Sequence, residues 1–217
     1  MRRSHIKPLR LAAAVAIGTV SFGGVAYAAS LGITTHKLFA WSQTLTKGTC
    51  NQTSTTTDDT YVQQLLPTST AGGTATTLTI SPAAAAQDYA FIRFNLSGCS
   101  IPTTGGADSA ALSVYVTSSG ADTISVFPVY SSWSSSTLNW NGVSGLTIGP
   151  TATGTFSASA TGATTVTVTA DVDAAIKAGT LWGWELRATS GIASIAIGAA
   201  ENSNSARRPS MTLSYEK

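Results

Sequence analysis

The sequence predicts an all-β protein, and within that class a β-sandwich or jelly roll. Three observations predict it. Hydrophobic residues make up 43% of the 217 residues and charged residues only 10%, the hydroxyl residues are abundant with 28 Ser and 34 Thr, and short runs alternate apolar and polar side chains with period two. Many short strands with almost no helix favour two packed sheets. The length suits one domain with a buried core.

The composition excludes several other classes of protein. The aliphatic content is too high for a disordered segment, there is no glycine period as in collagen, and Glu and Lys are too few for a coiled coil. No basic block of the kind that binds nucleic acid is present. The sequence also lacks a P-loop, a Rossmann glycine motif and metal-ligand histidine spacing. A secreted β protein remains.

Residues 1–28 are expected to be a signal peptide. Four cationic side chains within Met1–Arg10 precede an apolar run from Leu11 to Ala29, and Ala26-Tyr27-Ala28 has the small-x-small pattern of a cleavage site. No later apolar run is long enough to span a bilayer. Cleavage after Ala28 would leave eight Lys and Arg against ten Asp and Glu, so the formal net charge would move from +2 to −2. The mature chain is therefore expected to be extracellular, released or held at the cell wall.

The rest of the chain is expected to form strands separated by turns, in an N-terminal segment, 29–57, and a jelly-roll domain, 58–217. The predicted strands, rich in Val, Ile, Thr and aromatic residues, are 37–42, 60–66, 74–80, 88–96, 110–117, 123–131, 137–140, 164–170, 180–188, 192–199 and 209–215. One helix is predicted over 171–179, with Asp171 as a cap and Gly179 as its end. The Thr-rich stretch 51–59 and the low-complexity stretch 152–163 are expected to be loops.

Cys50 and Cys99 are the only cysteines. In an oxidising compartment we expect them to form a disulfide. Such a bond would close a loop of roughly 50 residues and add on the order of 4 kcal/mol of stability. The alternative is two unpaired buried thiols, while a metal site made of two cysteines without a matching histidine is disfavoured.

Several short runs follow one another in an order typical of one family. They are DTYV at 59–62, AFIRFNLS at 90–97, ALSVYV at 111–116, SWSSSTLNWN at 132–141, Glu201, and RPSMTLSY at 208–215. This arrangement resembles the DNRLRE (disaggregatase-related) domain, which overlaps carbohydrate-binding module family 96, and it covers most of the mature chain. The resemblance implies a jelly-roll module that binds a polysaccharide and carries no catalytic activity. Two places depart from the family pattern: Ser135 and Ser136 replace a Glu and Gly, and Ala199-Ala200-Glu201 replaces Ser-Arg-Glu.

Catalytic chemistry has few candidate residues. After signal cleavage the one histidine is His36, which lies too near the terminus to serve as an oriented base in a triad. Glycoside hydrolysis needs two carboxylates across a cleft, and the pair Asp171 and Asp173 is better explained by helix capping. A polysaccharide lyase or hydrolase accessory nevertheless stays as one alternative function.

Strand parity predicts a carbohydrate-binding face made of Tyr89, Arg93, Tyr115, Glu185 and Arg187. If Ile92, Phe94 and Leu96, the apolar face of residues 110–117, and Trp182, Trp184 and Leu186 all turn inward, these five side chains line the outer surface of one sheet. Aromatic rings cover the C–H faces of sugars, while ionic groups bind hydroxyls or carboxylates. The alternative is a structural ion pair between Arg93 and Glu185, flanked by the tyrosines.

The remaining aromatic and acidic residues have simpler structural explanations. Trp133 and Trp140 are expected to fill or plug the core, whereas Tyr130 fits either role. No cofactor is required. A structural calcium ion would use Asp58 and Asp59, although adjacent acids in a loop are more often solvated. The mature charge favours a neutral or weakly charged glycan. A structural or adhesive protein that self-associates through sheet edges is a further alternative.

Overall fold

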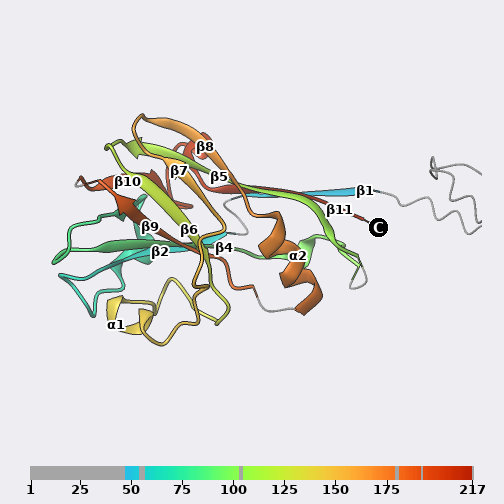
Figure 1. Cartoon of the computed structure of the whole chain (residues 1–217), viewed down its shortest axis with the longest axis horizontal. Helices are drawn as coiled ribbons and strands as arrows, with labels where there is room; N and C mark the ends of the chain where they lie inside the picture. The colour runs from blue at the N-terminus through green and yellow to red at the C-terminus, as the bar shows by residue number, and fades with distance from the viewer. Residues whose placement is uncertain (1–46, 54–56, 103–104, 179–180, 192, 217) are drawn as a thin grey trace, which may run out of the picture. The chain divides into compact units, whose positions relative to one another are not determined.

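Two antiparallel sheets face each other in the computed structural model, which describes residues 47–53, 57–102, 105–178, 181–191 and 193–216 (Figure 1). The predicted all-β sandwich is therefore confirmed. The expected signal peptide, the strand predicted at 37–42 and His36 lie outside the described residues.

Among the described residues, one sheet has six strands. Along it lie β1 (Lys47–Gln52), β11 (Ser210–Glu216), β5 (Ala107–Ser118), β10 (Ile195–Gly198) and β3 (Thr77–Ile80), and β8 (Gly162–Thr167) pairs with the other edge of β5. The length of β5 allows this arrangement, because its first half pairs with β11 and its last residues with β10.

The second sheet has five strands, in the order β2 (Thr57–Gln63), β4 (Asp88–Phe94), β9 (Trp184–Ser190), β6 (Thr123–Pro128) and β7 (Gly154–Ser157). From β1 to β6, consecutive strands alternate between the two sheets, as in a jelly roll. Within the part of the chain that the structure describes, β2 forms one edge of this sheet and pairs with β4 alone.

The core lies between the sheets and follows the predicted parity. In β5, Leu112, Val114 and Val116 are at most 2% exposed, whereas Ser113 and Tyr115 between them are half-buried on the outer side. Ile92 of β4 and Leu186 of β9 face these residues from the other sheet. Alternation with period two thus places apolar side chains inside and hydroxyls outside.

Two strands were missed by the sequence pattern. Residues 51–59 and 152–163 were predicted as loops, but they contain the end of β1, the start of β2, and β7. Strand β1 turns Gly48, Cys50 and Gln52 inward, so its buried face carries no aliphatic side chain to reveal it. Strand β7 has a single buried side chain, Phe156.

The helices in the described ranges are few and short. The predicted helix is confirmed as α2 (Thr169–Ala178), but the prediction that Asp171 caps it was wrong, because Asp171 lies within the first turn. Its predicted end, Gly179, lies outside the described residues. Helix α1 (Trp140–Val143) begins where a strand was predicted over 137–140. That prediction was wrong because Asn139 caps α1: its side chain accepts a hydrogen bond from the Gly142 amide at 3.0 Å. Three short 3₁₀ turns are described as well: η2 (Ala71–Thr74), η3 (Leu96–Gly98) and η4 (Ser205–Arg207).

The Cys50–Cys99 disulfide is present, with the two Cα atoms 5.7 Å apart. Cys50 lies in β1 of the six-stranded sheet, and Cys99 follows β4 and η3 of the five-stranded sheet. The bond therefore joins the two sheets covalently. The Gln52 side-chain amide lies 2.9 Å from each sulfur.

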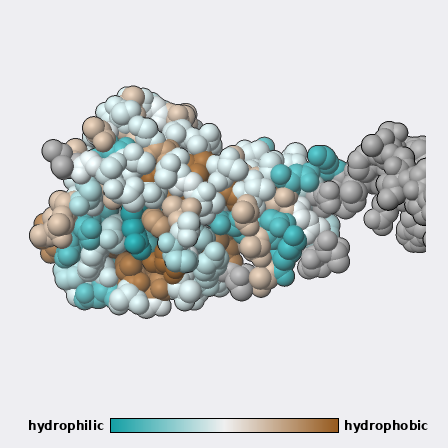
Figure 2. All heavy atoms as spheres, viewed as in Figure 1, coloured by the Kyte–Doolittle hydropathy of each residue, from teal (hydrophilic) through white to brown (hydrophobic). Residues whose placement is uncertain are grey.

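A covering loop, residues 129–148, lies over the outer face of the five-stranded sheet. Its Val129, Trp133 and Leu138 form a second buried cluster with Val62 and Phe91 of the sheet. Phe91 has the same strand parity as Tyr89 and Arg93, but it is fully buried in this cluster and contributes no open surface. Figure 2 shows an apolar patch beside the α1 segment of this loop, on a face otherwise coloured mostly near neutral hydropathy.

Candidate functional site

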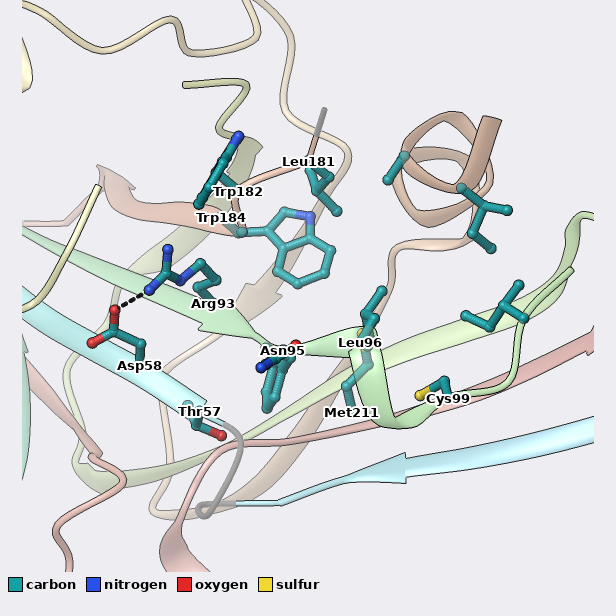
Figure 3. A pocket seen from close by; sticks show the side chains of 15 residues that line it. Thr57, Asp58, Arg93, Asn95, Leu96, Cys99, Leu181, Trp182, Trp184 and Met211 are labelled. Carbon is teal, nitrogen blue, oxygen red and sulfur yellow. Dashed lines mark hydrogen bonds and ion pairs between the residues drawn. The ribbon is translucent and has the colours of Figure 1, made fainter. Parts of the chain in front are cut away.

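An open pocket of about 760 Å³ lies at one end of the sandwich (Figure 3). It is formed where β2 and β9 begin and β4 ends, with α2 along one side. Because neighbouring antiparallel strands start and finish at the same end of a sheet, residues distant in sequence meet here. Its wall is polar towards Asp58 and Arg93 and apolar towards α2 and Met211.

An ion pair forms the polar side of the pocket. Arg93 Nη2 lies 2.5 Å from Asp58 Oδ2, and each side chain is about a quarter exposed. The two residues are paired in register on β4 and β2, which explains why they meet. Thr57 and Asn95 line the pocket beside them. These side chains offer donors and acceptors that are held in place before any ligand arrives.

The Arg93 guanidinium contacts two aromatic rings. Its Cζ lies 5.3 Å from the centroid of the Trp133 ring and 5.4 Å from that of Trp182, within the range of cation–π attraction. Trp133 is buried and donates from Nε1 to the Trp182 carbonyl at 2.6 Å. The expectation that Trp133 packs inside is confirmed, and the ring also positions Arg93.

Trp182 and Trp184 point to opposite sides, although a continuous strand would have placed them on one face. Trp184 is 1% exposed and lies in the core, whereas Trp182 is 36% exposed at the pocket. Gly183 between them has φ +98, and a Cβ there would lie 2.2 Å from the Ile92 carbonyl oxygen. This glycine conformation breaks the alternation, so the prediction that Trp182 faces inward with Trp184 was wrong.

The five residues predicted for a binding face do not lie on one sheet. Tyr89 and Arg93 of β4, and Glu185 and Arg187 of β9, occupy the outer side of the five-stranded sheet. Tyr115 lies in β5 of the six-stranded sheet, where the Arg207 guanidinium lies 5.3 Å from its ring. The expectation of a single shared surface was wrong, because parity assigns a residue to a face of its own strand but not to a sheet.

Glu185 and Arg187 form a structural pair beneath the covering loop. Glu185 is fully buried, and Arg187 donates to both of its carboxylate oxygens, at 2.7 Å between Nη2 and Oε2. Burial raises the pKa of Glu185, and the Arg187 hydrogen bonds oppose that rise. The alternative pairing of Arg93 with Glu185 was wrong, since Arg93 binds Asp58 instead.

Tyr89 belongs to the same packed group. Its ring centroid lies 4.9 Å from that of Trp140, and the Arg187 guanidinium lies 4.8 Å from it. Tyr89 OH donates to Gln87 Oε1 at 2.9 Å. Burial is the main cause of the raised pKa of Tyr89. Trp140 is half-buried and packs against the second cluster, as a plugging residue would.

The suggested calcium ligands Asp58 and Asp59 do not form one site. They are neighbours on β2 and therefore point to opposite faces of the sheet: Asp58 binds Arg93, and Asp59 accepts from the Ala200 amide. Within the described ranges there is no group of three or more His, Cys, Asp or Glu side chains able to hold a metal ion. None of the helices described there is long and apolar enough to cross a membrane.

The sequence interpretation found Arg93 but missed Trp182, Asp58 and Asn95 as its neighbours in the pocket. A signal for Trp182 was present, because an isolated glycine inside a strand pattern marks an interruption, and Gly183 lies between two tryptophans. No signal was available for Asp58, whose partner is set by the register of β2 against β4.

Comparison with known proteins agrees with this architecture. No curated protein matches the chain significantly. The family model described as carbohydrate-binding module family 96 matches residues 51–215, which include every strand of the sandwich except the start of β1 and the last residue of β11. The family resemblance noted in the sequence is thereby confirmed: the chain belongs to carbohydrate-binding module family 96.

Proposed function

We propose that this chain is a secreted, non-catalytic module that binds an extracellular or cell-wall polysaccharide in the pocket beside Trp182. The observation that carries the proposal is the exposed Trp182 ring placed next to the Arg93–Asp58 pair at the pocket. Membership of a carbohydrate-binding family supports the same ligand class.

The pocket has the two kinds of group that a sugar needs. An indole ring covers the apolar C–H face of a pyranose, and the carboxylate, guanidinium and amide of Asp58, Arg93 and Asn95 match its hydroxyl groups. Because Asp58 already neutralises Arg93, the polar side carries no net charge of its own. A neutral or weakly charged glycan therefore fits better than a strongly anionic one.

The test is a glycan array on the mature protein, followed by titration calorimetry with the best polysaccharide. Trp182→Ala should reduce the affinity at least tenfold, as expected for loss of an aromatic anchor worth about 2 kcal/mol. Tyr130→Ala is the matched control, because Tyr130 is 41% exposed and lies outside the pocket. Equal loss in both variants, or no loss in either, would contradict the proposed site.

The extracellular location is supported by the disulfide, which persists in oxidising compartments. Expression with the native N-terminus should yield a mature form in the medium or wall fraction that migrates differently on gels with and without reductant. Retention of the full-length chain inside the cell, with free thiols, would argue against secretion.

A second candidate function is adhesion by self-association. The outward side of the six-stranded sheet presents uncharged polar residues in register, such as Thr212 beside Asn51 and Ser113 beside Thr165, and Thr212, Asn51 and Thr165 are exposed. Light scattering at rising concentration distinguishes the two functions, because an adhesive protein should gain mass and a monomeric binder should not.

A further inference from the structure

The pocket beside Trp182 also has an apolar side that the proposed function does not use. Four half-buried aliphatic side chains form this side, which we call the aliphatic wall: Leu96, Ile101, Ile176 and Leu181. Leu96 and Ile101 belong to the segment around η3, Ile176 to α2, and Leu181 to the segment before β9. All four pack against the main core, so the fold itself holds the wall in place.

The polar and apolar parts of the pocket are separate. In Figure 3 the Arg93–Asp58 pair lies on one side, Leu96 and the coil of α2 lie on the other, and Asn95 lies between them. Arg93, Asn95 and Leu96 follow one another at the end of β4, so the same order appears along the chain. A ligand that fills the pocket therefore meets both kinds of surface.

The aliphatic wall discriminates against an unsubstituted sugar. Its side chains offer no hydrogen bond, and a hydroxyl group pressed against them loses water without gaining a partner. A methyl group in the same place gains free energy, because the contact removes apolar surface from water on both molecules. The wall therefore favours a ligand that carries an apolar group beside its sugar ring.

Asn95 supplies a polar group next to the wall. Its Oδ1 accepts a hydrogen bond from the Ser97 amide at 2.9 Å, at the start of η3. This hydrogen bond identifies the oxygen, so the other end of the amide is Nδ2, which carries two N–H donors. The Asn95 side chain is exposed and lines the pocket. A carbonyl oxygen beside the apolar group of the ligand matches this donor.

We propose that the polysaccharide bound in this pocket is acetylated. Its sugar ring stacks on Trp182, the acetyl carbonyl accepts a hydrogen bond from Asn95 Nδ2, and the acetyl methyl lies against the aliphatic wall. Polysaccharides with O-acetyl groups and those built from N-acetylated sugars both present this carbonyl and methyl. The inference rests on the pocket function proposed above and adds the chemistry of the ligand.

Two matched pairs of ligands test the proposal in titration calorimetry. Acetylated xylan is compared with the same xylan after alkaline deacetylation, and chitohexaose with cellohexaose, which has the same backbone linkage without the N-acetyl groups. At least one acetylated ligand should bind about tenfold more tightly than its partner, as one added apolar group in a hydrophobic pocket does. The pair that responds distinguishes O-acetyl from N-acetyl recognition. Equal affinities within both pairs would overturn the proposal.

The aliphatic wall is tested by Ile176→Thr against Ile176→Val, two side chains of the same shape that differ by a hydroxyl in place of a methyl. The affinity for the preferred acetylated ligand should be about fivefold lower in Ile176→Thr than in Ile176→Val. Val143→Thr, a half-buried position on α1 outside the pocket, is the control and should bind like the unmodified protein. Equal affinities in the two Ile176 variants would overturn the placement of the methyl group.

Asn95→Asp tests the hydrogen bond to the acetyl carbonyl. The carboxylate still accepts from the Ser97 amide, so η3 keeps its cap, but the N–H donor is lost. The affinity for the acetylated ligand should fall about tenfold, and its advantage over the deacetylated partner should shrink. If that advantage stays unchanged in Asn95→Asp, the acetyl carbonyl is not recognised and the proposal is overturned.

Saturation-transfer NMR and Trp182→Ala separate the remaining outcomes. In the unmodified protein, the acetyl methyl protons should receive the strongest transfer of all ligand protons, and weak transfer to them would overturn the proposal. If acetylated and deacetylated ligands bind equally and both need Trp182, the pocket function stands and the acetyl inference fails. If the acetylated ligand is preferred but Trp182→Ala has no effect, the ligand binds elsewhere and both proposals fail.

Discussion

The Arg93 guanidinium lies 5.4 Å from the centroid of the Trp182 ring while its Nη2 binds Asp58 Oδ2 on the neighbouring strand. One side chain thus connects the aromatic and the polar parts of the pocket. Its orientation is fixed from three directions, by Trp133, Trp182 and Asp58. A ligand that stacks on Trp182 meets a donor that is already in place, which lowers the entropy cost of binding.

Arg93→Lys should weaken glycan binding by about tenfold without unfolding the protein. Lysine keeps the charge opposite Asp58 but loses the planar guanidinium that contacts both indole rings and presents paired donors. Titration calorimetry measures the change, and Lys47→Arg, at an exposed ion pair outside the pocket, is the control. Unchanged affinity in Arg93→Lys would show that the planar group does not contact the sugar.

Gly183→Ala should disturb both the fold and the pocket. A Cβ at this position would lie 2.2 Å from the Ile92 carbonyl oxygen, and alanine would have to adopt the positive φ of +98 that Gly183 has. We therefore expect the free energy of unfolding to fall by about 1–3 kcal/mol. Because Gly183 directs Trp182 outward, glycan affinity should fall with it. Gly98→Ala is the control, since a Cβ there meets nothing within 4 Å. Urea unfolding and calorimetry on both variants check the prediction.

The sequence alone predicts the sandwich because alternation reflects a local rule. Leu112, Val114 and Val116 turn inward wherever β5 is placed, and the disulfide was predicted because the sequence has only two cysteines and was expected to reach an oxidising compartment. The same rule could not show that Tyr115 belongs to the other sheet, since strand order depends on pairing between distant segments.

The candidate site was predicted only in part for a related reason. Arg93 was identified because strand parity places it on the outer face of its strand, but its partners depend on register and on Gly183, which reverses the parity of Trp182. Glu185 has the correct parity for an outer face, yet it is fully buried, and its register partner Phe91 lies in the cluster that the covering loop forms with the sheet. Loops that cover a sheet leave no periodic signal in the strand beneath.

Replacing both cysteines by serine should lower the free energy of unfolding by about 4 kcal/mol, because the disulfide closes a loop with a sequence separation of 49. The bond also joins the two sheets near the pocket, which Cys99 lines. Urea unfolding with and without reductant measures the effect. The serine variant should be insensitive to reductant, and a reductant response in that variant would point to a cause other than this bond.

Arg187→Met should destabilise the protein by about 3–5 kcal/mol near neutral pH, because it leaves the fully buried Glu185 carboxylate without a partner. Burial already raises the pKa of Glu185 against the effect of Arg187. Removing the guanidinium raises that pKa further, so the folded variant keeps a proton that the unfolded chain loses. The loss of stability should therefore be small near pH 4 and grow as the pH rises.

The double variant Glu185→Gln, Arg187→Met should recover most of the stability at neutral pH, since no charge remains buried. Urea unfolding at several pH values tests this, and a pH-independent loss in Arg187→Met would mean that Arg187 stabilises the sheet through its contacts with Tyr89 and Phe127 instead.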